Sequence, residues 1–145
     1  MLIVKIDLCL VETDIFFNQL YFEKTMKIFD SNIIIHSIKD EYSYLIQYLF
    51  EPDATISEVS KLEVLGYPHL TEREKSNFEE IFKGVTILPI NSTIVDKAVE
   101  LKQEKKMSIG DSIIDATALL NNLELHTRNI SDFKHLPLTV VNPMI

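Results

Sequence analysis

Short apolar segments with the character of β-strands alternate with helix-like segments from Met26 to the end of this 145-residue chain. Because the strand pattern is short and apolar, we predict strands at residues 27–30, 54–56, 85–89, 123–127 and 138–141. Helices are predicted at residues 31–38, 41–50, 57–66, 71–82 and 108–122, with another beginning at Asn91 or Ser92. Such alternation implies a mainly parallel sheet with helices on both faces, which makes the chain an α/β protein.

The N-terminal segment does not fit this alternation. Residues 1–25 show no clear unit that the pattern needs, and Met26 stands directly before the first core strand. We interpret residues 1–25 as an N-terminal extension, or as a segment ahead of a natural start at Met26. Residues 26–145 are then the domain. The alternative is a genuine N-terminal strand and helix.

The charge of the chain restricts its partners. A net charge of −8 argues mildly against nucleic acid, because proteins that bind phosphates are usually basic. The objection is weaker for a metal nuclease, because its acids cluster at one site where bound cations reverse the local field. A basic partner protein is the other reading. The lone cysteine and the absence of any apolar run near the roughly 20 residues of a membrane span predict a cytoplasmic protein with no membrane partner.

Several acids recur where the predicted strands end or helices begin. Asp30 ends the first strand, Asp132 lies in the loop after residues 123–127, and Glu63 and Asp111 lie early in helices. In parallel sheets ligands bind beyond the carboxyl ends of the strands, so these acids are candidates for one shared site. Magnesium and manganese prefer such hard oxygen ligands. If the acids do not converge, they are ordinary surface carboxylates.

Two helices carry further polar groups at helical spacing. Asp111 and Asp115 are four residues apart, so both project from one face, and a cation would relieve the repulsion between them. Asp111 alone could simply favour the helix start. In the pattern Ser57-x-x-Ser60-x-x-Glu63, three polar groups stack on one side of a helix. A stripe that faces solvent is the alternative, and Glu58 is a competing acid whose spacing fits less well.

Other chemistries find less support. The histidines show no zinc-type spacing, and neither a Gly-rich phosphate loop nor a nucleophile elbow is present. Lys102, Lys105 and Lys106 form a small basic cluster ahead of the Asp111 helix, which could touch RNA phosphates or simply end a solvated helix.

Taken together, four motifs resemble a PIN-domain ribonuclease of the VapC toxin type, over the region from Met26 to Ile145. The matching segments are Lys27-Ile28-Phe29-Asp30-Ser31-Asn32, Ser57-x-x-Ser60-x-x-Glu63, Gly110-Asp111-Ser112-Ile113-Ile114-Asp115-Ala116-Thr117-Ala118 and Thr127-Arg128-Asn129-x-x-Asp132-Phe133, followed by a terminal Val140-Val141-Asn142-Pro143. The resemblance implies a three-layer α/β/α domain whose acids bind Mg²⁺ or Mn²⁺.

The resemblance also implies roles for individual residues. Asp30, Glu63 and Asp111 match the core metal set, and Asn129, Asp132 or Asp115 completes it. Asp115 replaces what is often a small residue, and Ser31 replaces the more usual threonine. We therefore assign catalytic roles to Asp30, Glu63, Asp111 and Asp132, metal binding to Asp30, Glu63, Asp111 and Asp115, and supporting roles to Asn32, Ser60 and Asn129.

Family members are toxins of toxin–antitoxin pairs that cut RNA, often transfer or ribosomal RNA. By resemblance we expect metal-dependent RNA hydrolysis, a cognate antitoxin and a homodimer. One rival is a receiver-like regulatory domain, which would need a phosphorylatable Asp after its middle strand, whereas residues 85–88 are followed by Pro89-Ile90-Asn91. The second rival is a PIN-like binding module without catalysis.

Overall fold

The computed structural model describes residues 25–144. The interpretation of residues 1–25 therefore falls, except for Thr25, outside the described residues. No helix in the described part of the chain has the length and apolarity that crossing a membrane requires.

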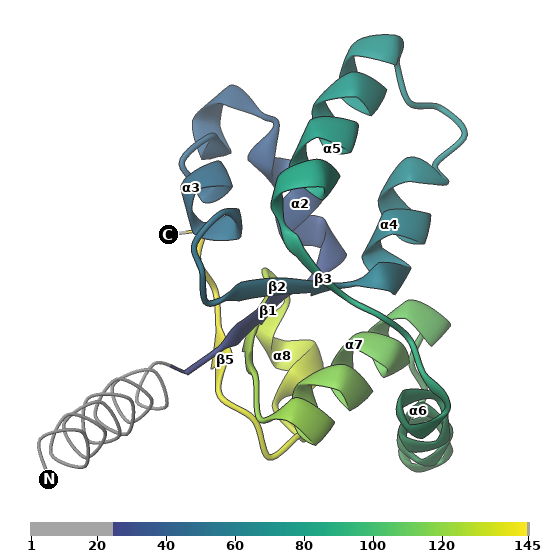
Figure 1. Ribbon diagram of the computed structural model, residues 1–145. Helices are drawn as coiled ribbons and strands as arrows, with labels where there is room; N and C mark the ends of the chain where they lie inside the picture. Colours follow the sequence, from purple (N-terminus) through teal and green to yellow (C-terminus); the bar gives the residue numbers. More distant parts are fainter. Residues whose placement is uncertain (1–24, 145) are drawn as a thin grey trace, which may run out of the picture.

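A five-stranded sheet lies at the centre of the molecule (Figure 1). Its strands run β3-β2-β1-β4-β5, and every neighbouring pair is parallel, as the alternating pattern predicts. The strands are β1 (Lys27–Phe29), β2 (Ala54–Ser57), β3 (Thr86–Leu88), β4 (Glu124–His126) and β5 (Val140–Val141). Phe29 is level with Ile56 on β2 and with His126 on β4, so β1 and β4 end together and β2 ends one residue later, at Ser57.

Helices cover both faces of the sheet, which confirms the three-layer α/β/α architecture (Figure 1). One face carries α2 (Ser31–Ser37), α3 (Leu45–Leu49), α4 (Glu58–Leu65) and α5 (Glu72–Gly84), and the other carries α6 (Ser92–Glu104), α7 (Ile109–Asn121) and α8 (Ile130–Phe133). Alternate residues of β1 serve the two layers: Phe29 packs in the core with Ile33 and Phe78, and Ile28 in the core with Ile114.

Polar side chains set the starts of the predicted helices. The Thr71 hydroxyl accepts a hydrogen bond from the Glu74 backbone N–H at 3.1 Å, as the capping-box spacing predicts. Asn91, rather than Ser92, caps α6 through its Oδ1, and Ser108 caps α7 by accepting from the Asp111 N–H. These caps place Asp111 in the first turn of α7.

Two segments differ from the prediction. The helix expected at residues 41–50 is a 3-10 turn, η1 (Asp40–Tyr42), followed by the short α3. Only Leu45 and Leu49 of α3 are fully buried, and one helical turn suffices to bury two apolar residues four positions apart. Helix α8 was not expected, because four residues are too few to show a helical period.

Strand order separates this fold from the receiver-like rival. The middle strand of the sheet is β1, and residues 86–88 form the edge strand β3. Receiver domains share the flavodoxin-like strand order 2-1-3-4-5, whereas this sheet has the order 3-2-1-4-5. The topology therefore excludes a receiver domain.

Candidate metal centre

Asp30 lies at the carboxyl end of the central strand. It follows β1 directly, stands at the N-cap position of α2, and is only 6% exposed. The buried Thr127 hydroxyl donates a hydrogen bond to Asp30 Oδ2 at 2.8 Å, and the Asp30 N–H donates to the His126 carbonyl at 2.9 Å. Because β1 and β4 end at the same level, the sheet itself holds this carboxylate in place.

Glu63 approaches the same region from α4. Its Oε1 accepts a hydrogen bond from the Ser31 hydroxyl at 2.8 Å, and the Ser31 oxygen also lies 2.9 Å from the Ser60 hydroxyl. A carboxylate can only accept, so the Ser31 proton goes to Glu63 and the Ser60 hydroxyl supplies the other proton. Ser60 is fully buried, and Ser57, also buried, caps α4. The polar stripe of α4 therefore faces the interior at Ser57 and Ser60 instead of facing solvent.

The first turn of α7 packs directly against the Glu63 carboxylate. A Cβ at Gly110 would lie 2.5 Å from Glu63 Oε2 and 2.8 Å from Oε1, so any larger residue would displace the carboxylate. Asp111 follows Gly110 and is half-buried. Helices α4 and α7 thus place the Glu63 carboxylate beside the first turn of α7, the turn that carries Asp111.

The carboxylates of the site influence one another electrostatically. The pKa of Asp30 is raised to about 6, chiefly by burial and to a smaller extent by the charges of Asp111 and Glu63, while the hydrogen bond from Thr127 opposes the rise. Burial also raises the pKa of Asp115 to about 8, with contributions from Asp111 and Asp30 and opposition from Lys105. Asp30, Glu63, Asp111 and Asp115 therefore form one group of interacting carboxylates.

The remaining predicted residues divide between two surroundings. Asp132 lines a cavity of about 220 Å³ together with Asp111 and Asp115. Asn129 is exposed at the start of α8; its backbone N–H donates to the Thr127 hydroxyl at 3.1 Å, and its side chain makes no capping hydrogen bond. Asn32 is half-buried on α2, and its Oδ1 has no hydrogen-bond partner among residues 25–144.

Comparison with known proteins identifies the family. The model of the PIN domain family matches residues 27–137. The chain belongs to the PIN-domain family. No curated protein sequence matches it.

Solved structures give the same assignment. A toxin–antitoxin complex from Klebsiella pneumoniae contains a chain that is 33% identical to this PIN domain, with a TM-score of 0.66, covering 81% of this chain and 97% of the other. VapBC2 from Rickettsia felis, bound to a promoter DNA fragment, is 22% identical with a TM-score of 0.68, covering 81% and 98%. VapBC-1 from nontypeable Haemophilus influenzae is 21% identical with a TM-score of 0.63, covering 81% and 97%. At these lower identities the last two support the fold alone.

The donor chemistry of this PIN domain suits a hard divalent cation. Carboxylate oxygens predominate at the site, and the buried Asp115 Oδ1 has no hydrogen-bond partner among the described residues. No three His, Cys, Asp or Glu side chains within residues 25–144 are gathered closely enough to ligate one ion. The site therefore contains carboxylate ligands of the type that such a cation prefers. In this structure the side chains are too far from one another for three of them to ligate one ion.

Two residues of this PIN domain contribute to the site without having been proposed for it. Thr127 fixes Asp30, and the absent side chain of Gly110 leaves the space that the Glu63 carboxylate occupies. Both lie within matched motifs, but only the position of Thr127 at a strand end gave a physical signal. The sequence contains nothing to connect Gly110 with Glu63, because that contact arises between two helices.

Proposed function

We propose that this PIN domain is a ribonuclease that depends on Mg²⁺ or Mn²⁺, and that it is the toxin of a VapBC-like toxin–antitoxin pair. The observation that carries the proposal is the set of carboxylates Asp30, Glu63 and Asp111 at the carboxyl ends of the central strands. None of them forms an ion pair with any residue in the described range. Membership of the PIN family supports a nuclease, and similarity to chains of toxin–antitoxin complexes supports a toxin.

The residues of the site have separable tasks in this proposal. Asp30, fixed by Thr127, and Glu63, fixed by Ser31, present oxygens to the cation, and Asp111 approaches from the first turn of α7. Asp132, Asn129 or Asp115 completes the ligand set. A bound divalent cation supplies an activated water and neutralises charge on the RNA phosphate. Hydrolysis would then need no side-chain nucleophile: the water oxygen would bond to phosphorus, one P–O bond of the RNA backbone would break, and the departing oxygen would take up a proton.

The charge of the chain restricts how RNA can bind. A net charge of −8 disfavours binding of RNA along a broad surface, so attraction to phosphate falls to the cation and to Lys105 and Lys106 beside Asp111. We propose a structured RNA such as transfer or ribosomal RNA as substrate, with a cognate antitoxin and a second copy of this chain as partners.

Cleavage by two purified variants tests the function. Asp30→Asn and Asp111→Asn should each reduce Mn²⁺-dependent cleavage of RNA by at least about 100-fold and abolish growth arrest on expression, because each removes a charge that the cation requires. Asp53→Asn is the matched control, since Asp53 lies at the opposite end of β1 and pairs with Lys27. Unchanged cleavage by a folded, nuclease-free Asp30→Asn protein would defeat the proposal.

A binding module without nuclease activity is the second candidate. It is favoured by one observation: the acids of the described chain do not close on a single ion position. Such a module does not depend on three acids meeting at one ion, and it would leave RNA intact at every Mn²⁺ concentration tested.

A further inference from the structure

Arg128 differs from several other basic residues because its partner is a histidine and not an acid. Its Nη1 lies 3.1 Å from His36 Nε2, and it forms no ion pair with a carboxylate among the described residues. Lys27, Lys83 and Lys97 by contrast each reach an acid. In a chain with 22 acids and 14 lysines and arginines, this arginine keeps a positive charge that no described carboxylate pairs with.

The contact with Arg128 determines which nitrogen of His36 carries the proton. A guanidinium can only donate, so Nε2 must accept and the ring proton lies on Nδ1. The pKa of His36 is lowered chiefly by burial and then by the charges of Lys39 and Arg128, while Glu41 opposes the change. The ring also packs edge-on against Tyr42, with the two ring centroids 5.4 Å apart. The neutral imidazole therefore orients the guanidinium without neutralising its charge.

Arg128 and His36 both belong to elements that carry the metal centre. Arg128 directly follows Thr127, whose hydroxyl donates to Asp30 Oδ2 at 2.8 Å. His36 lies on α2, the helix whose N-cap position is Asp30. Six residues of helix separate the two, which corresponds to roughly 9 Å along the helix axis. The guanidinium is therefore held on the α2 side of the carboxylates.

Lys39 adds a second positive charge on that side. It is exposed just beyond the end of α2, and it lines the same cavity as Glu63. Lys105 and Lys106 line the cavity of Asp111, on the face of the sheet that α6 and α7 cover. Basic side chains thus lie near the acids on both faces of the sheet, although the chain as a whole is acidic.

The chemistry of Arg128 suits a phosphate. A guanidinium carries five N–H donors in a planar fork, and the contact with His36 uses one of them. Because Arg128 is exposed, its other donors can reach a ligand from solvent. Arginine binds phosphate through paired hydrogen bonds, and every nucleotide of an RNA strand presents one phosphate.

We propose that Arg128, oriented by His36, binds a phosphate of the RNA backbone on the α2 side of the metal centre, next to the phosphate that is cut. The inference rests on the proposed function, because it takes RNA as the substrate. A phosphate that does not react is held equally in the ground state and in the transition state. Arg128 therefore contributes to RNA affinity and not to the chemical step.

The salt dependence of RNA binding tests this contact without any cleavage. The protein is the full chain carrying Asp111→Asn, and the probe is a short fluorescein-labelled RNA hairpin. Adding Arg128→Gln should reduce the slope of log affinity against log KCl concentration by about 0.7–1, the value for one phosphate contact. The same slope corresponds to about 5–10-fold weaker binding at about 0.1 M KCl.

Arg73→Gln is the matched control, because Arg73 is the only other arginine of the chain and the change in net charge is the same. Arg73 is exposed at the start of α5, and it lines a cavity together with Asp40 and Glu80. This control should leave the salt slope unchanged. Equal losses in the two variants would show that only net charge matters, and they would overturn the phosphate contact, as would an unchanged slope in Arg128→Gln.

His36 provides a second variant if Arg128→Gln fails to fold. His36→Phe keeps an aromatic ring beside Tyr42 but removes the nitrogen acceptor, so RNA binding should weaken several-fold. His36→Gln keeps an acceptor and should retain most of the affinity. Full RNA affinity in a folded His36→Phe protein would overturn the positioning role of His36.

Cleavage by the otherwise wild-type Arg128→Gln protein distinguishes this contact from the proposed nuclease function. In the presence of Mn²⁺, the KM for the hairpin should rise about 5–10-fold while kcat stays near that of the wild type. A lower kcat with an unchanged KM would overturn the contact. RNA binding that depends on Arg128, in a wild-type protein that cuts no RNA, would refute the nuclease and leave the contact intact. Cleavage that does not depend on Arg128 would do the reverse.

Discussion

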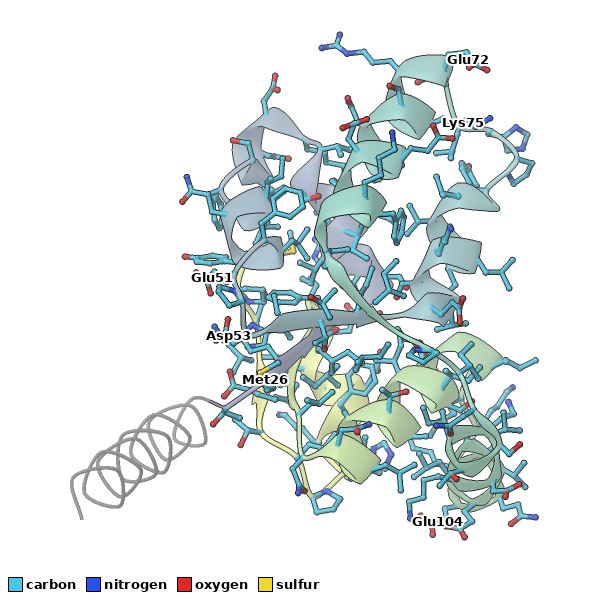
Figure 2. All side chains as sticks on the ribbon, in the orientation of Figure 1. Met26, Glu51, Asp53, Glu72, Lys75 and Glu104 are labelled. Carbon is cyan, nitrogen blue, oxygen red and sulfur yellow. The ribbon has the colours of Figure 1, made fainter. Side chains whose placement is uncertain are left out.

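The carboxylates near the two ends of strand β1 differ in whether they form ion pairs. At its start, Lys27 reaches Glu51 Oε2 at 3.4 Å and Asp53 Oδ2 at 3.2 Å, and Figure 2 shows Glu51 and Asp53 beside the beginning of the strand, near Met26. At its other end, Asp30, Glu63, Asp111 and Asp115 influence one another and form no ion pair within residues 25–144. The carboxylates at the start of β1 thus form ion pairs with a lysine, whereas those at its end form none within the described residues.

This difference in ion pairing indicates which end of β1 could bind a cation. The two acids at the start of β1 share one ammonium, that of Lys27, so these acids have a structural role. Those at its end receive hydroxyl hydrogen bonds, as Asp30 does from Thr127, but these orient a carboxylate without neutralising its charge. Removing a carboxylate should therefore change the folding stability in opposite directions at the two ends. The stabilisation by Mn²⁺ should also differ between variants at the two ends.

The largest effect is expected from Asp115→Asn in the metal-free protein. Burial raises the pKa of Asp115 from 3.8 to about 8, so the folded state holds this proton more tightly than the unfolded state does. The contribution of protonated Asp115 to the folding stability is fully present below about pH 4. That contribution is lost as the pH rises through about 8. Since each pKa unit corresponds to about 1.4 kcal/mol, the variant should be more stable than wild type at pH 8 by several kcal/mol. Urea unfolding in the presence of a chelator measures this.

The interval from pH 6.5 to 8 isolates Asp115 from other groups. The raised pKa of Asp30 lies near 6, and burial lowers the pKa values of His36 and His126 below 6.5. Between these limits the wild-type protein should lose roughly 2 kcal/mol of stability, and Asp115→Asn should remain nearly flat. A wild-type stability that rises over this interval would contradict the assignment. Asp53→Asn, at the other end of β1, should destabilise the protein.

Gly110→Ala should produce the next largest effect, on metal binding. The new Cβ would lie 2.5 Å from Glu63 Oε2, so the carboxylate must move away from its hydrogen bond with Ser31. Changes to groups that support metal ligands typically reduce affinity 10–100-fold, and we expect about that loss in a Mn²⁺ titration. Ile109→Ala, next to it and 68% exposed, is the control. Full affinity in a folded Gly110→Ala protein would show that the position of Glu63 does not matter.

The sequence predicted the layers better than the site. The alternating pattern identified all five strands and predicted a mainly parallel sheet, which the structure shows to be parallel throughout, because strand and helix periods are local properties. It did not reveal that β1 is the middle strand, since neighbour order depends on how helices pack across the sheet. The contact of Gly110 with Glu63 escaped for the same reason: it joins α4 to α7, far apart in the chain.

The candidate acids could be selected from their positions relative to the predicted strands and helices. Asp30 and Thr127 follow strands that end together, and parallel sheets place such residues at one edge. The surroundings of Asp132 and Asn129 could not be predicted, because Asp132 lies on the short α8 and Asn129 directly precedes it, and Phe133, which is buried in the core, sets the orientation of that helix. Only the structure shows that Asp132 lines the cavity of Asp115 while Asn129 is exposed.

Ser31→Ala should cause a smaller loss, because it removes orientation without removing charge. The Ser31 hydroxyl donates to Glu63 and lies against the buried Ser60 hydroxyl, which would lose its partner. We expect about 1 kcal/mol of destabilisation and a few-fold weaker Mn²⁺ binding. Ser31→Thr keeps the hydroxyl and should restore Mn²⁺ affinity. Equal affinities for the Ala and Thr variants would remove Ser31 from the site.

The smallest effect is expected from Lys27→Gln, at the start of β1. Lys27 is partly exposed, and ion pairs of this kind contribute about 1 kcal/mol or less, so unfolding should become easier by that amount. The gain in stability on adding Mn²⁺ should equal that of the wild type, because Glu51 and Asp53 lie at the opposite end of β1 from Asp30. Thermal melts with and without Mn²⁺ measure both quantities. A smaller stabilisation by Mn²⁺ in Lys27→Gln would mean that the two ends of β1 are energetically coupled. The ion pairs at the start of the strand and the acids at its end would then not act independently.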